Sequence, residues 1–208
     1  MLKVFLGKTD VLLTSPYNDC TRYSERLKKL VEGKNTVESY CHVAGETLLK
    51  YALQCDDKLN ITEDENGKPR LADASTYFNL SDYGHYVACA ISDGNVGVDV
   101  MFANAKVASV INRYASDAEK AWMDKEDCRI RSAFLWSVRE SSVKLAGLGI
   151  RALSDVRVLF DTLKCSSDVW TVDSVMSGFY LHCTGFRTDD CFVVVASEST
   201  ERALFVRL

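Results

Sequence analysis

The sequence predicts an α+β protein built from two pseudo-symmetric lobes, each a small antiparallel sheet packed with a long helix. One observation is that helix-like and strand-like segments follow the same order in both halves of the 208 residues. Another is that no linker rich in Ser or Gly separates the halves, and the only prolines are Pro16 and Pro69. We therefore expect a lobe at residues 1–102 joined compactly to a lobe at residues 103–208.

The first half predicts helices followed by strands. Residues 19–33 begin with a capping residue, Asp19 or Thr21, and read as a helix. Residues 37–53 have the apolar face of a second helix. A loop with a tight turn at Asn66–Gly67 comes next. The strand-like segments that follow are residues 76–81, 85–92 and 96–102.

The second half repeats this order. Residues 116–125 and 130–149 are expected to form helices, the second of them long and amphipathic. The strand-like segments after them are residues 156–160, 178–186, 191–198 and 203–208. No residue-level repeat accompanies this parallel, so the similarity between the halves is one of organisation.

Composition and charge are those of an ordinary soluble globule, with 47% hydrophobic and 26% charged residues. The net charge of −4, without any cluster of Lys and Arg, argues against a general nucleic-acid binder. The N-terminus lacks the features of a signal peptide, and no apolar run is long enough to span a bilayer. We expect a cytoplasmic protein with no membrane or nucleic-acid partner.

The eight cysteines include no CxxC pair. Zinc sites use ligands at short, regular spacings, so no zinc site is expected. The cysteines read as scattered small hydrophobic residues in a reducing compartment.

Three charged residues carry the chemistry that the pattern suggests. Glu140 and Lys144 stand four apart on one face of the expected helix, which by itself is typical of a surface ion pair. Asp99 lies between two valines of a strand, where it either faces solvent or is held inward for a purpose. Their meaning depends on the segments around them.

Four segments, taken in order, are GKPRL, FNLS, GVDV and FLWSVRESSVKLAGLGI, within residues 67–150. They resemble the 4′-phosphopantetheinyl transferases, and specifically the long, single-chain type that activates peptide synthetases. In that family the pattern runs approximately GKP, FNxSHS, GxDxE and WxxKEAxxKxxGxG. The ordered set is far more specific than any one motif.

The resemblance implies an enzyme in which a serine hydroxyl of an apo acyl or peptidyl carrier protein attacks the β-phosphate of coenzyme A. Phosphopantetheine is transferred and adenosine 3′,5′-bisphosphate is released. Such chemistry calls for positioning and for neutralising charge on the pyrophosphate, which Mg²⁺ provides. The active site would lie in the cleft between the lobes, and two fused lobes make a monomer the expected state.

The resemblance also assigns roles to individual residues. Asp99 and Glu140 match the metal carboxylates, and Glu140 would also take the proton from the carrier serine. Lys144 would steady the pyrophosphate or protonate the leaving phosphate. Lys68 in GKP matches a contact to the nucleotide phosphates, and Ser81 matches the first serine of SHS. Taken alone, a loop lysine is usually solvated and a serine at a strand end is usually turn chemistry.

This sequence departs from the pattern at three positions. Met101 replaces the third acidic residue of GxDxE, so an extra water would complete the Mg²⁺ shell. Arg139 replaces the lysine of KEA. Asp82 replaces the SHS histidine that would help bind the 3′-phosphate. Either the cofactor sits differently, affinity is reduced, or another basic group compensates, such as His85, Lys34 or Arg70.

Two rival interpretations stay open at this point. A non-catalytic coenzyme A or carrier-protein-binding protein could keep the fold and lose efficient chemistry, and Asp82 and Met101 favour it. A generic α+β domain with a fortuitous ion-pair helix explains each motif singly but not their order. The sequence does not identify the carrier.

Overall fold

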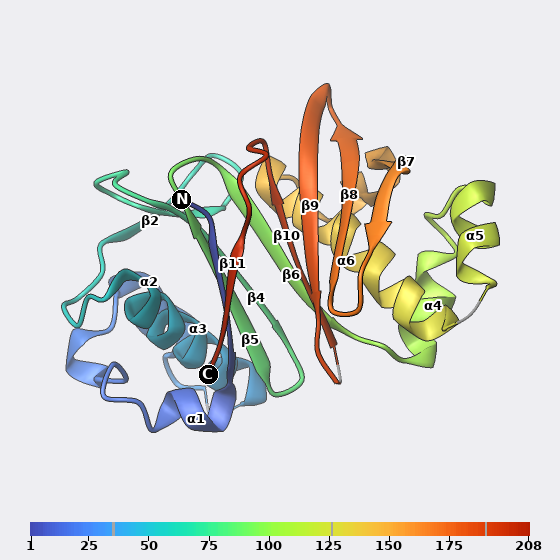
Figure 1. Ribbon diagram of the computed structural model, residues 1–208. Helices are drawn as coiled ribbons and strands as arrows, with labels where there is room; N and C mark the ends of the chain where they lie inside the picture. Colours follow the sequence, from blue (N-terminus) through green and yellow to red (C-terminus); the bar gives the residue numbers. More distant parts are fainter. Residues whose placement is uncertain (35, 126, 190) are drawn as a thin grey trace. The chain divides into compact units, whose positions relative to one another are not determined.

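A computed structural model describes residues 1–34, 36–125, 127–189 and 191–208 (Figure 1). The chain divides into two compact units. The first unit comprises Met1–Asn95 together with Glu201–Leu208, and the second comprises Val96–Thr200.

A four-stranded sheet forms the first unit, in the order β11-β1-β5-β4. Strands β1, β5 and β4 are antiparallel to their neighbours, whereas β11 runs parallel to β1. The strand bounds are β1 Lys3–Lys8, β4 Tyr77–Tyr83, β5 Tyr86–Ser92 and β11 Leu204–Arg207. The C-terminal strand therefore completes the sheet that the N-terminal strand begins.

The long helix α3 packs on this sheet. A capping box between Thr36 and Ser39 starts it, and Gln54 in the left-handed conformation ends it. Its Leu48 and Leu49 belong to a core cluster with residues of β1 and β5. Shorter helices lie beside it in Figure 1. The bounds are α1 Thr9–Leu13, the 3₁₀ turn Cys20–Arg22, α2 Glu25–Val31 and α3 Val37–Leu53.

A short hairpin carries the GKP motif. Strands β2, Ile61–Glu63, and β3, Pro69–Leu71, are antiparallel. In the loop between them, the Asp64 carboxylate accepts backbone hydrogen bonds from Asn66 and Lys68. Gly67 has a φ of 81°, which favours glycine in this turn. The loop thus fixes the backbone from which the Lys68 side chain starts.

The second unit has a five-stranded antiparallel sheet, in the order β6-β10-β9-β8-β7. Its long helix α6 lies along one face of the sheet, and α4 and α5 lie beside that helix (Figure 1). The core between them is aromatic, with Phe134, Trp170 and Phe192 in mutual contact. The bounds are β6 Val96–Phe102, α4 Ala105–Ile111, α5 Asp117–Met123, α6 Cys128–Ala146, the 3₁₀ turn Ile150–Asp155, β7 Arg157–Cys165, β8 Val169–Met176, β9 Phe179–Arg187 and β10 Cys191–Ser197.

The predicted α+β class is confirmed, with a sheet and a long helix in each unit. The predicted boundary at residue 102 assigns β6 to the first sheet and β11 to the second, but the structure pairs each of them in the other sheet. Strand β6, expected in the first sheet, pairs with β10 of the second unit, and β11, expected in the second, pairs with β1. The cause is long-range pairing, which local patterns do not report.

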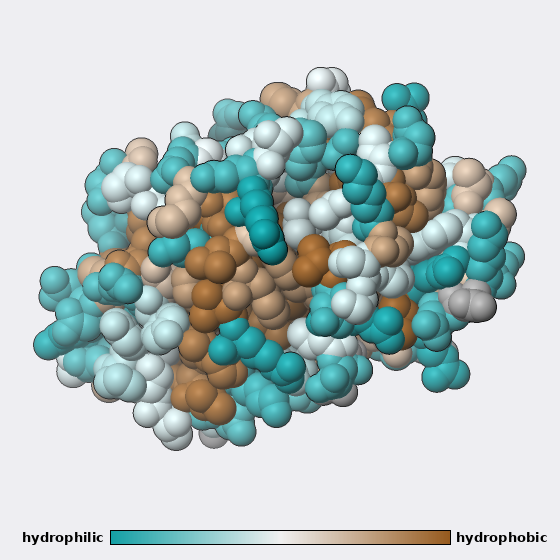
Figure 2. Space-filling model, viewed as in Figure 1, coloured by the Kyte–Doolittle hydropathy of each residue, from teal (hydrophilic) through white to brown (hydrophobic). Residues whose placement is uncertain are grey.

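The surface of the first unit is not uniformly polar. Figure 2 shows hydrophobic side chains gathered over β11 and α1, where Leu204 and Val11 are exposed. Across the described parts of the chain, no helix combines the length and the apolar character needed to cross a bilayer.

Candidate active site

Strand β6 turns Asp99 inward, against α6. Side chains alternate along a strand, so Gly97, Asp99 and Met101 share the face that α6 covers. The Asp99 side chain has a relative exposure of only 6%. A carboxylate buried to this degree needs partners.

Two side chains of α6 supply such partners. The Ser137 hydroxyl donates a hydrogen bond to one Asp99 oxygen, with Oγ and Oδ2 2.8 Å apart. Lys144 donates to the other oxygen, with Nζ and Oδ1 2.9 Å apart. Ser137, Glu140 and Lys144 are three and four residues apart, so they lie on one face of the helix. The structure therefore brings Asp99 and Lys144 into direct contact.

Glu140 belongs to the same group of charges. Burial raises the pKa of its carboxyl group, the Asp99 charge raises this pKa further, and Lys144 acts in the opposite direction. The Asp99 carboxylate is therefore close enough to Glu140 for its charge to affect the Glu140 pKa. Because its pKa is raised, Glu140 keeps its proton to a higher pH than an ordinary glutamate does. When both carboxyl groups are ionised, their negative charges attract a cation.

Gly97 allows this close approach of strand and helix. A Cβ atom built on Gly97 would lie 2.0 Å from the Ser141 carbonyl oxygen and 2.5 Å from the Leu145 backbone nitrogen. Both contacts are with backbone, which cannot move aside as a flexible side chain can. The first residue of GVDV is thus glycine because the α6 backbone occupies the space of any side chain there.

Arg139, next to Glu140, points into the core instead. It is 2% exposed and donates hydrogen bonds to the carbonyls of Leu153 and Val156, at 2.9 Å and 2.5 Å, and to the Glu119 carboxylate. Glu119 in turn accepts a hydrogen bond from the backbone of Ser116 in a capping box. Arg139 therefore ties α6 to α5 and to the chain that follows α6.

Two members of this arrangement were missed in the sequence analysis. Ser137 could have been found, because it is three residues before Glu140 and seven before Lys144, on the same helical face. Glu119 had the signal of a capping box, the Ser116-x-x-Glu119 spacing, but nothing local pointed to Arg139.

Lys68 and Ser81 lie in the first unit. Lys68 is 7% exposed and its Nζ donates to the Asn95 side-chain oxygen at 2.7 Å. Burial lowers the pKa of Lys68 to about 8, nearby Arg70 lowers it as well, and Asp64 opposes this. Ser81 is buried on β4, and its neighbour Asp82 is exposed.

Asp99 and Glu140 carry oxygen donors of the kind that Mg²⁺ prefers. Among the described residues, no group of three or more His, Cys, Asp or Glu side chains could hold a metal ion. Magnesium, however, commonly takes one or two protein carboxylates and completes its shell with phosphate oxygens and water. A cation would also offset the repulsion by which Asp99 raises the pKa of Glu140.

Comparison with known proteins identifies the class to which this fold and these residues belong. A family model described as the 4′-phosphopantetheinyl transferase superfamily matches residues 95–201, which hold Asp99, Glu140 and Lys144. The chain belongs to this superfamily.

Curated relatives point to the long, single-chain type. The chain is 28% identical over 134 residues to the 4′-phosphopantetheinyl transferase gsp of Aneurinibacillus migulanus, a match that covers 61% of this chain and 56% of the relative. It is 30% identical over 137 residues to psf-1 of Bacillus pumilus, with the same coverage. It is 29% identical over 105 residues to Sfp of Bacillus subtilis, covering 49% and 46%. The chain thus spans about half the length of these relatives.

Proposed function

We propose that this protein transfers the 4′-phosphopantetheine group of a coenzyme A donor to a serine of an apo carrier protein, in a Mg²⁺-dependent reaction. With coenzyme A itself, the released nucleotide is adenosine 3′,5′-bisphosphate. The observation that carries the proposal is the group of Asp99, Glu140 and Lys144 on β6 and α6, with Lys144 Nζ 2.9 Å from Asp99 Oδ1.

Glu140 is the proposed base. Its raised pKa suits a carboxylate that takes a proton from an alcohol, because a base is most effective when its pKa approaches the working pH. The carrier serine oxygen then forms its bond to the β-phosphorus, and the bond from that phosphorus to the bridging oxygen breaks.

Lys144 is the proposed partner of the leaving group. Its ammonium donates to Asp99 and lowers the pKa of Glu140, so it already acts on both carboxylates. Beside a pyrophosphate it would neutralise the charge that develops on the leaving phosphate, or donate a proton to it.

Asp99 and Glu140 would hold the metal. Mg²⁺ bound there would supply charge neutralisation on the pyrophosphate oxygens. Ser137 keeps one Asp99 oxygen oriented through the 2.8 Å hydrogen bond, which favours a fixed direction for the carboxylate.

Lys68 and Ser81 are the proposed contacts for the nucleotide end of the donor. The lowered pKa of Lys68 reflects the cost of burying its ammonium group next to the positive charge of Arg70. A phosphate bound there would stabilise the charged form of Lys68 through charge-assisted hydrogen bonds.

A second candidate is a non-catalytic protein that binds coenzyme A or a carrier protein. Two observations favour it, namely Met101 in place of a third carboxylate beside Asp99 and Asp82 in place of a histidine beside Ser81. It predicts binding of coenzyme A without any transfer.

The test is transfer itself. The protein is incubated with coenzyme A, Mg²⁺ and a panel of apo acyl and peptidyl carrier proteins, and intact mass spectrometry detects the phosphopantetheine adduct. Adduct that depends on Mg²⁺ and is lost in Asp99→Asn supports the transferase. Bound coenzyme A without adduct on any carrier supports the second candidate.

A further inference from the structure

The first unit holds a pocket of about 220 Å³ beside the proposed nucleotide contacts. It lies between α3, the β2–β3 hairpin and the edge strand β4. Pro69, which follows Lys68, lines the pocket, and so do Ser81 and Asp82. The pocket therefore lies beside the two segments that carry Lys68 and Ser81, the β2–β3 hairpin and β4.

The charges around the pocket do not suit an additional phosphate. Among the described lining residues, the basic side chains are Arg26 and His42 and the acidic ones are Glu46 and Asp82. The Arg26 guanidinium already binds Glu63 at 2.8 Å, and His42 Nε2 lies 3.7 Å from a Glu38 oxygen. Each of these basic side chains therefore lies near a carboxylate that does not line the pocket.

Asp82 lies close to α3. The α3 residue Cys41 lines the pocket together with Asp82, and burial together with the Asp82 charge raises the pKa of the Cys41 thiol. Phe78, Leu80 and Asp82 alternate along β4 and so share the face that looks toward α3. The negative charge of Asp82 therefore lies at the pocket and not on the opposite face of the sheet.

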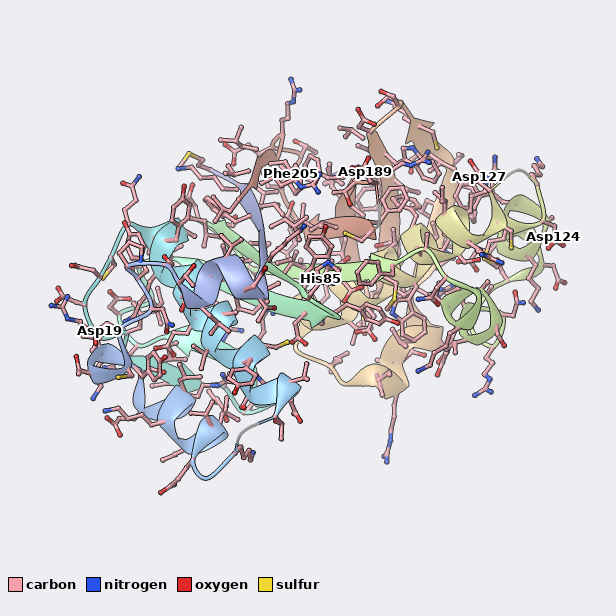
Figure 3. All side chains as sticks on the ribbon, turned by 90° about the horizontal axis from the view of Figure 1, so that it is seen from below. Asp19, His85, Asp124, Asp127, Asp189 and Phe205 are labelled. Carbon is pink, nitrogen blue, oxygen red and sulfur yellow. The ribbon has the colours of Figure 1, made fainter. Side chains whose placement is uncertain are left out.

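The basic residues that could compensate for Asp82 do not line this pocket. Arg70 binds Asp64 at 3.0 Å. His85 lies at the turn between β4 and β5, where Figure 3 labels it, and lines a different pocket with Lys8 and Asp10. Lys34, which follows α2, is exposed and lines neither pocket.

A carboxylate beside a ribose selects free hydroxyl groups. In dinucleotide-binding proteins an acidic residue accepts a hydrogen bond from a ribose hydroxyl, whereas an arginine nearby accommodates a phosphate at that position. The same physics applies wherever a carboxylate meets a ribose, because it accepts from O–H and repels a phosphate.

We infer that Asp82 makes this protein accept a donor with a free ribose 3′-hydroxyl, 3′-dephospho-coenzyme A, at least as well as coenzyme A; the inference rests on the proposed function. With this donor the carrier serine oxygen bonds to the same β-phosphorus, Glu140 takes the serine proton, and the broken bond leaves adenosine 5′-monophosphate. Asp82 is then the specificity-determining residue for the nucleotide end.

Binding and transfer are measured separately to test this. Dissociation constants for coenzyme A and 3′-dephospho-coenzyme A are determined by calorimetry in Mg²⁺ buffer of low ionic strength, which limits screening. The wild type is expected to bind the dephosphorylated donor at least as tightly as coenzyme A. Asp82→His is expected to shift the ratio of the two constants about tenfold toward coenzyme A.

Asp57→His is the matched control, because Asp57 is exposed in the same unit and lies outside the pocket. It should leave the ratio unchanged. Tighter wild-type binding of coenzyme A, or no change of ratio in Asp82→His, overturns the inference.

Transfer from both donors to apo carrier proteins then separates the two proposals. Binding preference without transfer from either donor retains the assignment of Asp82 and defeats the proposed function. Transfer from coenzyme A with little from the dephosphorylated donor retains the function and overturns the assignment. Failure of both donors to bind overturns both.

Discussion

Lys144 and Asp99 form an ion pair between α6 and β6, with Nζ 2.9 Å from Oδ1. The second Asp99 oxygen is bound by Ser137, and the Asp99 charge reaches Glu140, whose pKa it raises. The four side chains form one electrostatic unit in which a change at one position alters the others. This coupling determines what the site variants should do.

Glu140→Gln should lower the rate of transfer by about 100-fold or more, because a general base contributes roughly that much. Glutamine keeps the shape of the side chain and loses both its basicity and its negative charge. The measurement is the initial rate of phosphopantetheine adduct formation under Mg²⁺ saturation. Glu198→Gln, at an exposed position of the second unit, controls for the general effect of removing a carboxylate. A Glu140→Gln enzyme with the wild-type rate would remove Glu140 as base.

Gly97→Ala should destabilise the protein by about 3 kcal/mol or more, since overpacking against an unyielding neighbour reaches or exceeds that value. The added Cβ would meet the α6 backbone at 2.0 Å and 2.5 Å. The free energy of unfolding from urea titration is the measurement. Gly94→Ala is the matched control, since its Cβ meets nothing within 4 Å. Equal stability of the two variants would contradict the packing argument.

Arg139→Lys should destabilise the protein by about 2 to 3 kcal/mol, although it restores the lysine of the family pattern. The guanidinium binds two carbonyl groups and the Glu119 carboxylate at once, and an ammonium cannot reproduce this planar geometry. The measurement is again urea unfolding. Lys120→Arg, an exchange of the same pair of residue types in helix α5, serves as the reference. An Arg139→Lys protein as stable as the wild type would show that the three hydrogen bonds contribute little.

The fold class could be read from the sequence because each long helix and most strands carry a local pattern. Helix α6 has its apolar stripe, and the alternation in β4 and β5 is visible in single segments. Buried and partly exposed residues alternate along strand β8 too, with Trp170 and Val172 buried. The sequence pattern did not predict this strand, because polar residues separate its apolar ones. The placement of β6 and β11 was not readable, because pairing is decided between distant segments.

The sequence predicts the residues of the site better than their contacts. Asp99 is a candidate because a carboxylate among strand-forming residues contradicts the local pattern, and such contradictions tend to mark functional residues. The spacing of Glu140 and Lys144 identified a helix face but not what faces it. That Lys144 meets Asp99, and that Arg139 turns away from Glu140 into the core, follow from packing alone.

The stability contribution of Lys68 should change between about pH 8 and pH 10.5. Its pKa is lowered to about 8 in the folded protein, while the unfolded chain has the ordinary value of 10.5. In this window the unfolded chain binds the proton and the folded protein does not, so stability rises with pH. Relative to Lys68→Met, the wild type should gain up to about 3 kcal/mol over this window.

Urea unfolding of both proteins at pH 7.5, 8.5 and 10 gives the measurement. Comparison with the variant removes the titration of all other groups from the difference. Lys29→Met, at an exposed position, controls for the loss of one lysine. A difference between wild type and Lys68→Met that stays constant with pH would mean that the Lys68 ammonium is not desolvated.

Met101→Glu should retain transfer and lower the Mg²⁺ concentration needed for half-maximal rate. Met101 and Asp99 are two residues apart on β6, so a carboxylate at position 101 would point from the same face of the strand. It would offer a third ligand in place of one water, at some cost in stability because Met101 packs against the core of the second unit. The measurement is the initial rate of transfer as a function of Mg²⁺ concentration. Met101→Gln is the control, because glutamine is polar but does not add a negative charge. Abolition of transfer in Met101→Glu, with the fold intact by circular dichroism, would show that the metal does not lie beside Asp99.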